Sequence, residues 1–561
     1  IRGLRILSSF TGTIVQQAGN SVTVGSNGWD QAGGILSGGD ATIDVNGTFT
    51  LSGGTYNNTS TTLSVSDNFT LSSTGTFTNA SGTLLLDGDL TFTDSTSPQQ
   101  NVGRVIVGSS PDVIDLASDI TAVSITVNSN DTYNSNGYDM DLSGTFTING
   151  TFDATDDIET DETLISIGRS LIVNSGAMLT ADQSTMTFDG TPGTYDLITD
   201  GTFSLYNVTI DNGGSGLTIE VEDPLDVNGD IIITNGTLDV VSGENNAVFV
   251  GGDFDNNDNF LARSGTITFD GSAAQIVSAG NDNLSFVEVT NSTADVTFNE
   301  AFTTTDFTST TPGASMKFQQ STTFTVSGSL RLDGNISNKI HVDSVNGSTR
   351  FTFDVTGSDQ MVSNVNVSNS NASTNDIYAT GSVDGGNNDE EEATPHWVFL
   401  VSFSDITSTA NLGSSPGGGA VVIFYCNNDG FLDVFMGEDV TPSSPARLRQ
   451  NDGDNTFTDR DSQIVNDYRG AAAGDYDNDG DTDLIFGFTQ RLYTNSNATD
   501  CTFTNSTAGS VNNNEAIMFF DIDGDGDLDL WSPGEDYLWH RNDGGTTFTS
   551  QTSLPGGIDR H

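Results

Sequence analysis

The sequence predicts an all-β protein in two parts: a parallel β-helix, or solenoid of stacked turns, over residues 1–395, and a repeat module over residues 396–561. A short pattern built around a glycine recurs about every twenty residues through the first part. The 63 glycines and the abundant Asn, Ser, Thr and Asp supply turns every few residues, and no long stretch has helical periodicity. Hydrophobic residues make up only 34% of the chain, which suits a narrow stack of turns better than a thick core.

The repeating pattern is clearest at residues 45–51, Val-Asn-Gly-Thr-Phe-Thr-Leu. It predicts a turn at the glycine and then a short strand whose side chains alternate between two faces. The central apolar residues of the first three copies, Phe49, Phe69 and Leu90, are expected to stack in ladders inside the solenoid. Further copies of the pattern lie at residues 65–71, 86–92, 142–148, 167–173, 227–233, 250–256 and 326–332.

A second, longer spacing of slightly over eighty residues separates Phe188, Phe269 and Phe353, each of which lies in a similar apolar segment. We interpret this spacing as four turns of about twenty residues. An array of immunoglobulin-like sandwiches is the alternative, because about a hundred residues suits one such domain. The shorter period nested within the longer one favours the solenoid. The region also resembles the β-helical repeat regions of large bacterial surface proteins, a resemblance that says little about activity.

The charge balance argues against nucleic acid as a partner. Sixteen basic and 76 acidic residues give a formal net charge of −60, whereas phosphate binding needs the opposite sign. The acidity has two explanations that the sequence does not separate, namely aspartates used in metal loops and turns, or a surface suited to a saline medium. No apolar run approaches the roughly 18–20 residues of a membrane span, so none is predicted.

The chain begins at Ile1 without Met or a signal-peptide pattern, and we interpret it as a mature or trimmed form of a longer protein. Its two cysteines, Cys426 and Cys501, either pair or stay free, and the sequence leaves both alternatives open. The glycine-rich and acidic segment 384–392, followed by Pro395, marks the boundary between the two parts. Residues 397–400, Trp-Val-Phe-Leu, are expected to cap the end of the stack.

The most specific motif is a pair of aspartate loops, residues 475–484 and 521–530, with carboxylates at alternate positions around a glycine. Such loops wrap oxygen ligands around a hard cation, and Ca²⁺ takes about six to eight oxygens. An acidic turn without metal is the alternative, but the packed carboxylates would then repel one another. We therefore predict two calcium sites, in which the backbone carbonyls of Asp481 and Asp527 complete coordination by Asp475, Asp477, Asp479 and Asp483 in one loop and by Asp521, Asp523, Asp525 and Asp529 in the other.

These loops are not predicted to be EF-hands. The twelfth position, where an EF-hand has a bidentate Glu, is Phe486 in one loop and Ser532 in the other, and the flanking residues are typical of strands. A third, degenerate copy at residues 425–435 has Tyr425 and Asn427 in place of the first two carboxylates. It is predicted to bind a cation weakly or not at all.

A further sequence element follows each loop: Asn-Asp-Gly and, a few residues later, Thr-Phe-Thr. Its three copies lie at residues 451–459, 497–505 and 542–549, and the second copy is looser than the other two. With this element, residues 403–552 resemble FG-GAP/VCBS repeats, the calcium-bearing blades of integrin-type β-propellers found in many secreted microbial proteins. The resemblance implies a four-stranded blade per repeat, a Ca²⁺ in its edge loop, and a role in binding or scaffolding. Three units are fewer than the four to eight blades of a typical ring. We therefore expect a partial β-propeller-like module, with further blades in a longer chain or an edge that pairs with another molecule.

These features predict an extracellular structural or adhesive protein, secreted or on the cell surface, and a fibre or filament subunit that associates with itself or with other surface proteins or glycans. No catalytic residue is predicted, because His341, His396, His540 and His561 form no recognisable constellation. The alternative is a secreted polysaccharide-acting β-helix enzyme with an appended binding module. The acid-rich stretch 153–162 offers carboxylates for glycoside hydrolysis, although a solvated loop is the simpler interpretation. Asn-X-Ser/Thr triplets, open to glycosylation but also expected by chance, occur for example at Asn46, Asn68, Asn149, Asn207, Asn235, Asn291, Asn335 and Asn497.

Overall fold

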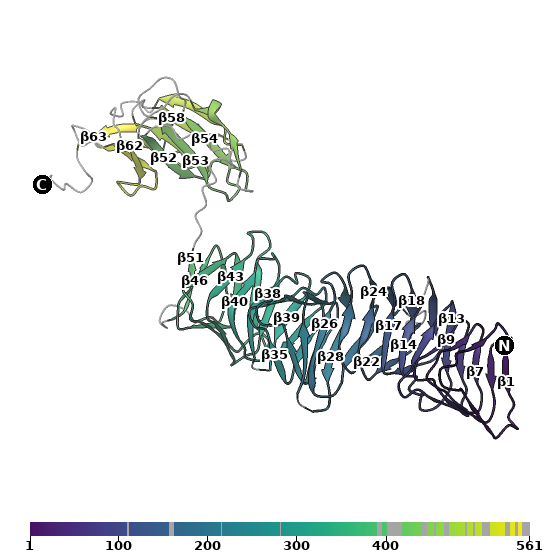
Figure 1. Cartoon of the computed structure of the whole chain (residues 1–561). Helices are drawn as coiled ribbons and strands as arrows, with labels where there is room; N and C mark the ends of the chain where they lie inside the picture. Colours follow the sequence, from purple (N-terminus) through teal and green to yellow (C-terminus); the bar gives the residue numbers. More distant parts are fainter. Residues whose placement is uncertain are drawn as a thin grey trace. The chain divides into compact units, whose positions relative to one another are not determined.

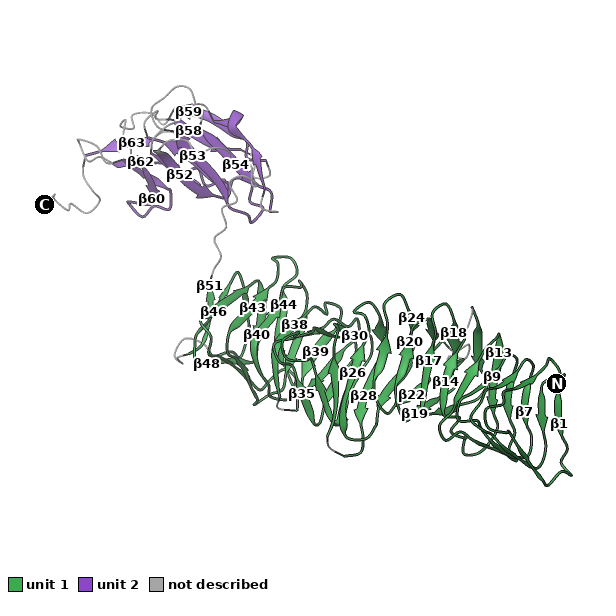
Figure 2. Cartoon of the chain, in the orientation of Figure 1, with its two compact units in different colours: residues 1–402 green, residues 403–561 purple. Residues whose placement is uncertain are grey.

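A computed structural model of the chain divides into two compact units, residues 1–402 and 403–561, which are coloured green and purple in Figure 2. The structure describes residues 1–108, 111–155, 162–214, 216–280, 282–389, 395–400, 418–438, 446–453, 456–464, 470–487, 491–496, 500–507, 516–532, 539–544 and 548–552.

Unit 1 is a parallel β-solenoid of about 18 turns, as the sequence predicts (Figure 1). Successive short strands mostly enter different sheets, and each strand pairs in parallel with the strands one turn before and after it. The alternative of separate sandwiches, which are antiparallel, is wrong. Five sheets result: nine strands from β1 (Leu4–Ile6) to β24 (Met178–Thr180), four from β2 (Thr13–Val15) to β11 (Gly75–Thr78), twelve from β3 (Val22–Val24) to β35 (Asn259–Leu261), thirteen from β16 (Ile120–Ala122) to β50 (Val383–Gly386), and thirteen that include β27 (Ser204–Leu205) and β51 (Trp397–Leu400).

Apolar side chains from all turns form one continuous buried core along unit 1. Phe49 of β7 (Phe49–Leu51) stacks on Phe69 of β10 (Phe69–Leu71), with ring centroids 5.0 Å apart, and Phe69 stacks on Phe92 at 5.3 Å. Leu90 is also buried, as predicted, but in a neighbouring ladder: it pairs with Ile114 of the following turn, whereas Phe92 is the residue that pairs with Phe69. The turn from Phe69 to Phe92 is longer than the turn before it, so a fixed spacing of twenty residues misplaces the register by two residues.

At Gly47 the glycine of the repeating pattern is favoured by the close approach of successive turns, although the next copy has Asp67 at this position. A Cβ atom at Gly47 would lie 2.8 Å from the carbonyl oxygen of Ser26 in the preceding turn. Such a contact would force the backbone apart, so this position favours glycine. The apolar residues of the pattern therefore indicate the buried face, and its glycine indicates where two turns approach closely.

The eighty-residue spacing corresponds to four turns in only one of its two intervals. Phe188 ends β25 (Thr185–Phe188), which lies in the same sheet as β16 and β50, whereas Phe269 ends β36 (Thr266–Phe269), which lies in the sheet of β27 and β51. Phe353 of β45 (Phe351–Val355) lies in the same sheet as Phe269, four strand pairings further on, so only the segment of Phe188 occupies a different side of the solenoid. Both sides bury alternate apolar residues, so their sequences look alike although their positions in the turn differ.

Residues 397–400 form β51, the last strand of the solenoid, which pairs with β49 (Ile377–Thr380). The Trp397 side chain is buried, and its Nε1 donates a hydrogen bond to Ser370 Oγ at 3.0 Å. Because this strand belongs to the stack, the compact unit extends to residue 402, beyond the predicted boundary at residue 395.

Unit 2 consists of three four-stranded antiparallel sheets, named here F, G and H. The strands lie in sequence order within each sheet, and β52 lies beside β56, which lies beside β60. One apolar cluster is buried between F and G and another between G and H. Sheet F contains β52 (Gly418–Phe424), β53 (Asp433–Glu438), β54 (Arg447–Asn451) and β55 (Phe457–Asp459); G contains β56 (Ala471–Gly474), β57 (Asp483–Phe486), β58 (Arg491–Asn495) and β59 (Phe503–Thr507); H contains β60 (Met518–Phe520), β61 (Asp529–Trp531), β62 (Trp539–Asn542) and β63 (Phe548–Gln551).

Candidate metal site in the aspartate loops

Each aspartate loop connects the first and second strands of one sheet. The loop before Asp483 joins β56 to β57, and the loop before Asp529 joins β60 to β61. The degenerate loop occupies the same place in sheet F, between β52 and β53. Strands therefore flank all three loops, as predicted.

The last aspartate of each loop is buried and fastens the loop to its sheet. Asp483 accepts hydrogen bonds from the backbone N–H groups of Tyr476, at 3.1 Å, and Asn495, at 2.7 Å. Asp529 is held in the same way by the N–H groups of Ile522, at 2.9 Å, and Asn542, at 2.8 Å. The carboxylate thus closes the turn and binds the third strand of the sheet, whether or not a cation is present.

The asparagines in these contacts have a second role that sequence reasoning missed. Asn495 Nδ2 donates to the carbonyl oxygen of Cys426 in the preceding repeat, at 2.7 Å, and Asn542 Nδ2 donates to that of Tyr476, at 2.6 Å. Each asparagine therefore joins its sheet to the loop of the preceding sheet. The recurrence of Asn at the end of the third strand was the available sequence signal.

The structure brings three side chains of each predicted calcium site together. Carboxylate oxygens of Asp475, Asp477 and Asp483 lie within 4.8 Å of one another, and so do those of Asp521, Asp523 and Asp529. The other predicted side chains make contacts within and between the loops. Asp479 accepts a hydrogen bond from the backbone N–H of Asp481 at 3.0 Å, and Asp525 accepts one from that of Asp527 at 3.1 Å. The Asp527 carboxylate also accepts a hydrogen bond from Asn478 Nδ2 at 2.6 Å.

The electrostatics of the first loop favour a bound cation. The pKa of Asp483 is raised to about 7, chiefly by burial; the carboxylates of Asp477 and Asp479 act in the same direction and the N–H groups of Asn495 and Tyr476 oppose them. Burial and neighbouring carboxylates also raise the pKa of Asp477, whose Oδ1 is buried without a hydrogen-bond partner in the described part of the chain. An unpartnered buried carboxylate oxygen facing other carboxylates is what a divalent cation would satisfy.

The second loop differs because a cation of the protein lies beside it. Arg541 Nε is 3.4 Å from Asp523 Oδ2, and its Nη2 also pairs with Asp543. Burial and the neighbouring Asp525 and Asp529 raise the pKa of Asp523, whereas Arg541 acts to lower it. The carboxylates of both loops could hold a metal ion, and the guanidinium makes the electrostatic potential at the second loop less negative than at the first.

In the degenerate loop an amide replaces the second carboxylate. Asn427 Nδ2 donates to Asp429 Oδ2 at 2.6 Å, so a nitrogen donor already faces that carboxylate. Asp433 keeps the structural role of Asp483 and Asp529, since it accepts the N–H groups of Cys426 and Asn451, both at 2.7 Å. This loop can hold its shape without a metal, and its weak cation binding stays a prediction.

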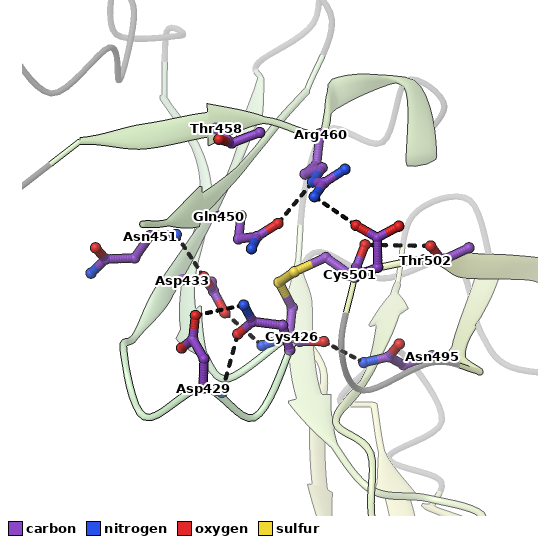
Figure 3. The surroundings of a disulfide bond; sticks show 12 residues. Cys426, Asp429, Asp433, Gln450, Asn451, Thr458, Arg460, Asn495, Cys501 and Thr502 are labelled. Atoms are coloured by element: carbon purple, nitrogen blue, oxygen red, sulfur yellow. Dashed lines mark hydrogen bonds and ion pairs between the residues drawn. A yellow bond between two sulfur atoms is a disulfide. The ribbon is translucent and has the colours of Figure 1, made fainter. Parts of the chain in front are cut away.

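A disulfide bond links Cys426 with Cys501, which decides the alternative left open by the sequence (Figure 3). Both cysteines are buried, and the bond joins the loop of sheet F to the segment before β59 of sheet G. Arg460 adds a second connection, since its Nη2 lies 2.6 Å from Asp500 Oδ1. Sheets F and G are therefore fastened covalently, whereas packing and hydrogen bonds join G and H.

Among the described residues of unit 1, one group of three carboxylates lies close enough together to hold a metal ion. Oxygens of Asp196, Glu220 and Glu222 lie within 4.8 Å of one another on neighbouring turns, and burial together with nearby acids raises the pKa of Glu222. The predicted carboxylate source at residues 153–162 lies largely outside the described residues, as does the triplet at Asn497.

Residues 426–486 match the family model of the FG-GAP-like repeat. The match begins at Cys426 and ends at Phe486, so it covers most of the first repeat and the loop of the second. Curated proteins give no match to this chain. Among the described residues, no helix has the length and hydrophobicity to cross a membrane.

The buried His540 gives unit 2 a testable dependence on pH. Its Nδ1 lies 3.1 Å from Ser550 Oγ, and burial lowers its pKa. An unfolded chain binds a proton at His with a pKa of about 6.5, so below that pH the unfolded state binds more protons and stability is lost. Relative to His540→Gln, the wild-type free energy of unfolding should fall by up to about 1.4 kcal/mol per pH unit below about 6.5. Denaturant titrations of both proteins at several pH values measure this difference, and parallel pH profiles would contradict it.

Proposed function

We propose that this chain is an extracellular structural or adhesive surface protein, secreted or held at the cell surface, in which a rigid solenoid carries a calcium-stabilised module. The observation that carries the structural role is the solenoid of about 18 turns, whose inward apolar side chains are buried in one continuous core. A stack of this kind spans distance with little interior, and its stability comes from contacts between neighbouring turns. The FG-GAP-like repeat and the two carboxylate loops support the module's role in binding or scaffolding.

The proposal includes self-association into fibres or filaments and contacts with other surface proteins or glycans. The net charge of −60 supports binding of calcium ions by the protein surface and argues against nucleic acid as a partner. Electron microscopy and light scattering of the concentrated protein with calcium test the filament. Monomers under these conditions would contradict it.

Calcium removal tests the metal part of the proposal. Extracellular calcium modules bind with dissociation constants of about 10⁻⁴–10⁻³ M, so millimolar calcium should stabilise unit 2 by about 1 kcal/mol for each occupied loop. Calorimetry of the whole chain should show that EDTA lowers the melting temperature of unit 2 and leaves that of the solenoid nearly unchanged.

Variants assign the calcium effect to its loops. The double substitution Asp475→Asn and Asp521→Asn should remove the effect, because it takes one carboxylate from each cluster. Asp429→Asn in the degenerate loop is the matched control and should retain it. An unaltered unit 2 transition at zero calcium would count against both sites.

A polysaccharide-acting enzyme remains the second candidate, and the cluster of Asp196, Glu220 and Glu222 is the observation that favours it. Glycoside hydrolysis uses a pair of carboxyl groups, one of them an acid with a raised pKa, and burial and nearby acids raise the pKa of Glu222. Screening against acidic and neutral polysaccharides separates the two functions. Turnover abolished by Glu222→Gln would replace the structural proposal with the enzymatic one.

A further inference from the structure

The three sheets of unit 2 repeat one packing contact. Counted back from the first residue of each loop, Val421, Ala471 and Ile517 occupy equivalent positions, as do Val422, Ala472 and Met518. In sheet G these two positions face opposite neighbours: Ala471 joins the apolar cluster shared with F, and Ala472 joins the cluster shared with H. Each sheet therefore has one face that receives the preceding sheet and another that receives the following sheet.

The receiving face of F is uncovered. Val421 and Ile423 are 66% and 61% exposed, although their equivalents Ala473 in G and Phe519 in H, together with Ala471 and Ile517, pack against the preceding sheet. Strand pairing places Val434 of β53 opposite Ile423, on the same face. This face, defined by Val421, Ile423 and Val434 and called here the F face, has apolar residues, and none of the sheets in the described part of the chain lies on it.

The opposite face of H is also uncovered. Met518 and Phe520 are 53% and 44% exposed, whereas their equivalents in F, Val422 and Phe424, pack toward the following sheet. Trp531 pairs with Met518 across β60 and β61 and lies on the same face. Met518, Phe520 and Trp531 define the H face.

We propose that the H face of one copy packs on the F face of a second copy by the same contact that joins F to G and G to H. The two faces are residue-by-residue counterparts of the surfaces already buried twice within the chain, so the occupant of each is another repeat of this kind, which a second copy supplies. Two copies together present six sheets, within the four to eight of closed β-propeller rings. Large apolar faces left in water are costly, and burying them stabilises association.

A polar contact fits the same arrangement. Asn495 and Asn542 each donate to a carbonyl oxygen of the preceding repeat and, more weakly, to one of their own repeat, Thr482 O at 3.4 Å and Leu528 O at 3.3 Å. Asn451, their equivalent in F, makes the contact within its own repeat, to Leu432 O at 3.1 Å, and among the described residues it has no preceding repeat to reach. In the proposed pair, the group equivalent to Cys426 O and Tyr476 O is the carbonyl of Ile522 in the second copy. The Asn451 side chain lies at the position that would reach it.

This inference deepens the self-association in the proposed function and depends on it. Sedimentation of the whole chain over a range of concentrations is expected to show reversible pairing. Ile423→Asp on the F face and Met518→Asp on the H face should each weaken it by at least about tenfold, because each buries a carboxylate in an apolar contact. Ile336→Asp, at a 78% exposed solenoid position, is the matched control and should change nothing.

Mixing the two variants gives the decisive result. Met518→Asp keeps an intact F face, and Ile423→Asp keeps an intact H face. If the contact joins unlike faces, these two intact faces can pair in the mixture. Association should therefore return on mixing, although neither variant associates alone. A contact between like faces would instead survive in one variant alone and would overturn the inference. Monomers at every concentration, or association indifferent to both substitutions, would also overturn it. Calorimetry with and without calcium on the same samples shows separately whether the calcium part of the proposed function holds.

Discussion

Phe318→Ala is expected to destabilise the solenoid by about 3–5 kcal/mol, the range for truncating a buried phenylalanine. Phe318 lies in β41 (Ser315–Phe318) and is completely buried among five other rings. It stacks on Phe298 and Phe351 with centroids 5.0 and 4.7 Å away, and it meets Phe324 and Phe353 edge-on at 4.9 and 4.8 Å. Removing the ring leaves a cavity where several turns meet, and the rigid backbone ladders limit collapse around it.

The measurement is denaturant unfolding of the whole chain, followed by circular dichroism and by calorimetry of the solenoid transition. Phe318→Leu keeps most of the volume and should cost less than about 1.5 kcal/mol. Ile336→Ala, at an exposed position, should stay within about 0.5 kcal/mol of wild type. A Phe318→Ala loss as small as that of the surface control would show that this aromatic cluster does not support the stack.

Breaking the disulfide is expected to cost unit 2 about 4 kcal/mol. Cys426 and Cys501 are 75 residues apart in sequence, and a crosslink over a loop of that length reduces the entropy of the unfolded chain by an amount worth about 4 kcal/mol at room temperature. The bond also holds the degenerate loop against sheet G, where packing, the Arg460–Asp500 ion pair and the hydrogen bond from Asn495 to Cys426 O would otherwise join F and G.

Calorimetry of the double variant Cys426→Ala and Cys501→Ala measures this loss in the unit 2 transition. The backbone N–H that Cys426 donates to Asp433 is kept in the variant, so the loop retains that bond. Wild type under a reducing agent is the matched control and should lose a similar amount. Identical unit 2 transitions in oxidised and reduced protein would contradict the prediction.

The sequence could predict much of the solenoid because its pattern is local. Alternating apolar residues and a glycine at each turn, as in residues 45–51, specify strand, face and close approach without reference to distant residues. It could not predict register where turns differ in length: Phe92 pairs with Phe69, although Leu90 is the apolar residue about twenty positions further on. The segments around Phe188 and Phe269 have similar sequences although they lie in different sheets, because every side of a solenoid alternates buried apolar and outward polar residues.

The aspartate loops show the same division. Alternate carboxylates around Gly480 and Gly526 indicated a cation-binding turn, because such turns carry their ligands within a few residues. The sequence did not show that the aspartates of one loop have different structural roles. Asp483 and Asp529 are buried and each accepts hydrogen bonds from two backbone N–H groups, one of them on the third strand of the sheet. Asp479 and Asp525 accept hydrogen bonds from within their own loop. That difference depends on a strand more than ten residues away.

The sequence by itself determined the all-β composition, the stacked turns and the three repeats, since each follows from short-range periodicity and turn chemistry. Only the tertiary structure decided which aromatic rings meet, that Cys426 joins Cys501, and that Asn495 and Asn542 reach the preceding repeat. It also decided which sheet faces lack a neighbour. These outcomes depend on which distant segments are brought together, and contacts of that kind leave no fixed spacing in the chain.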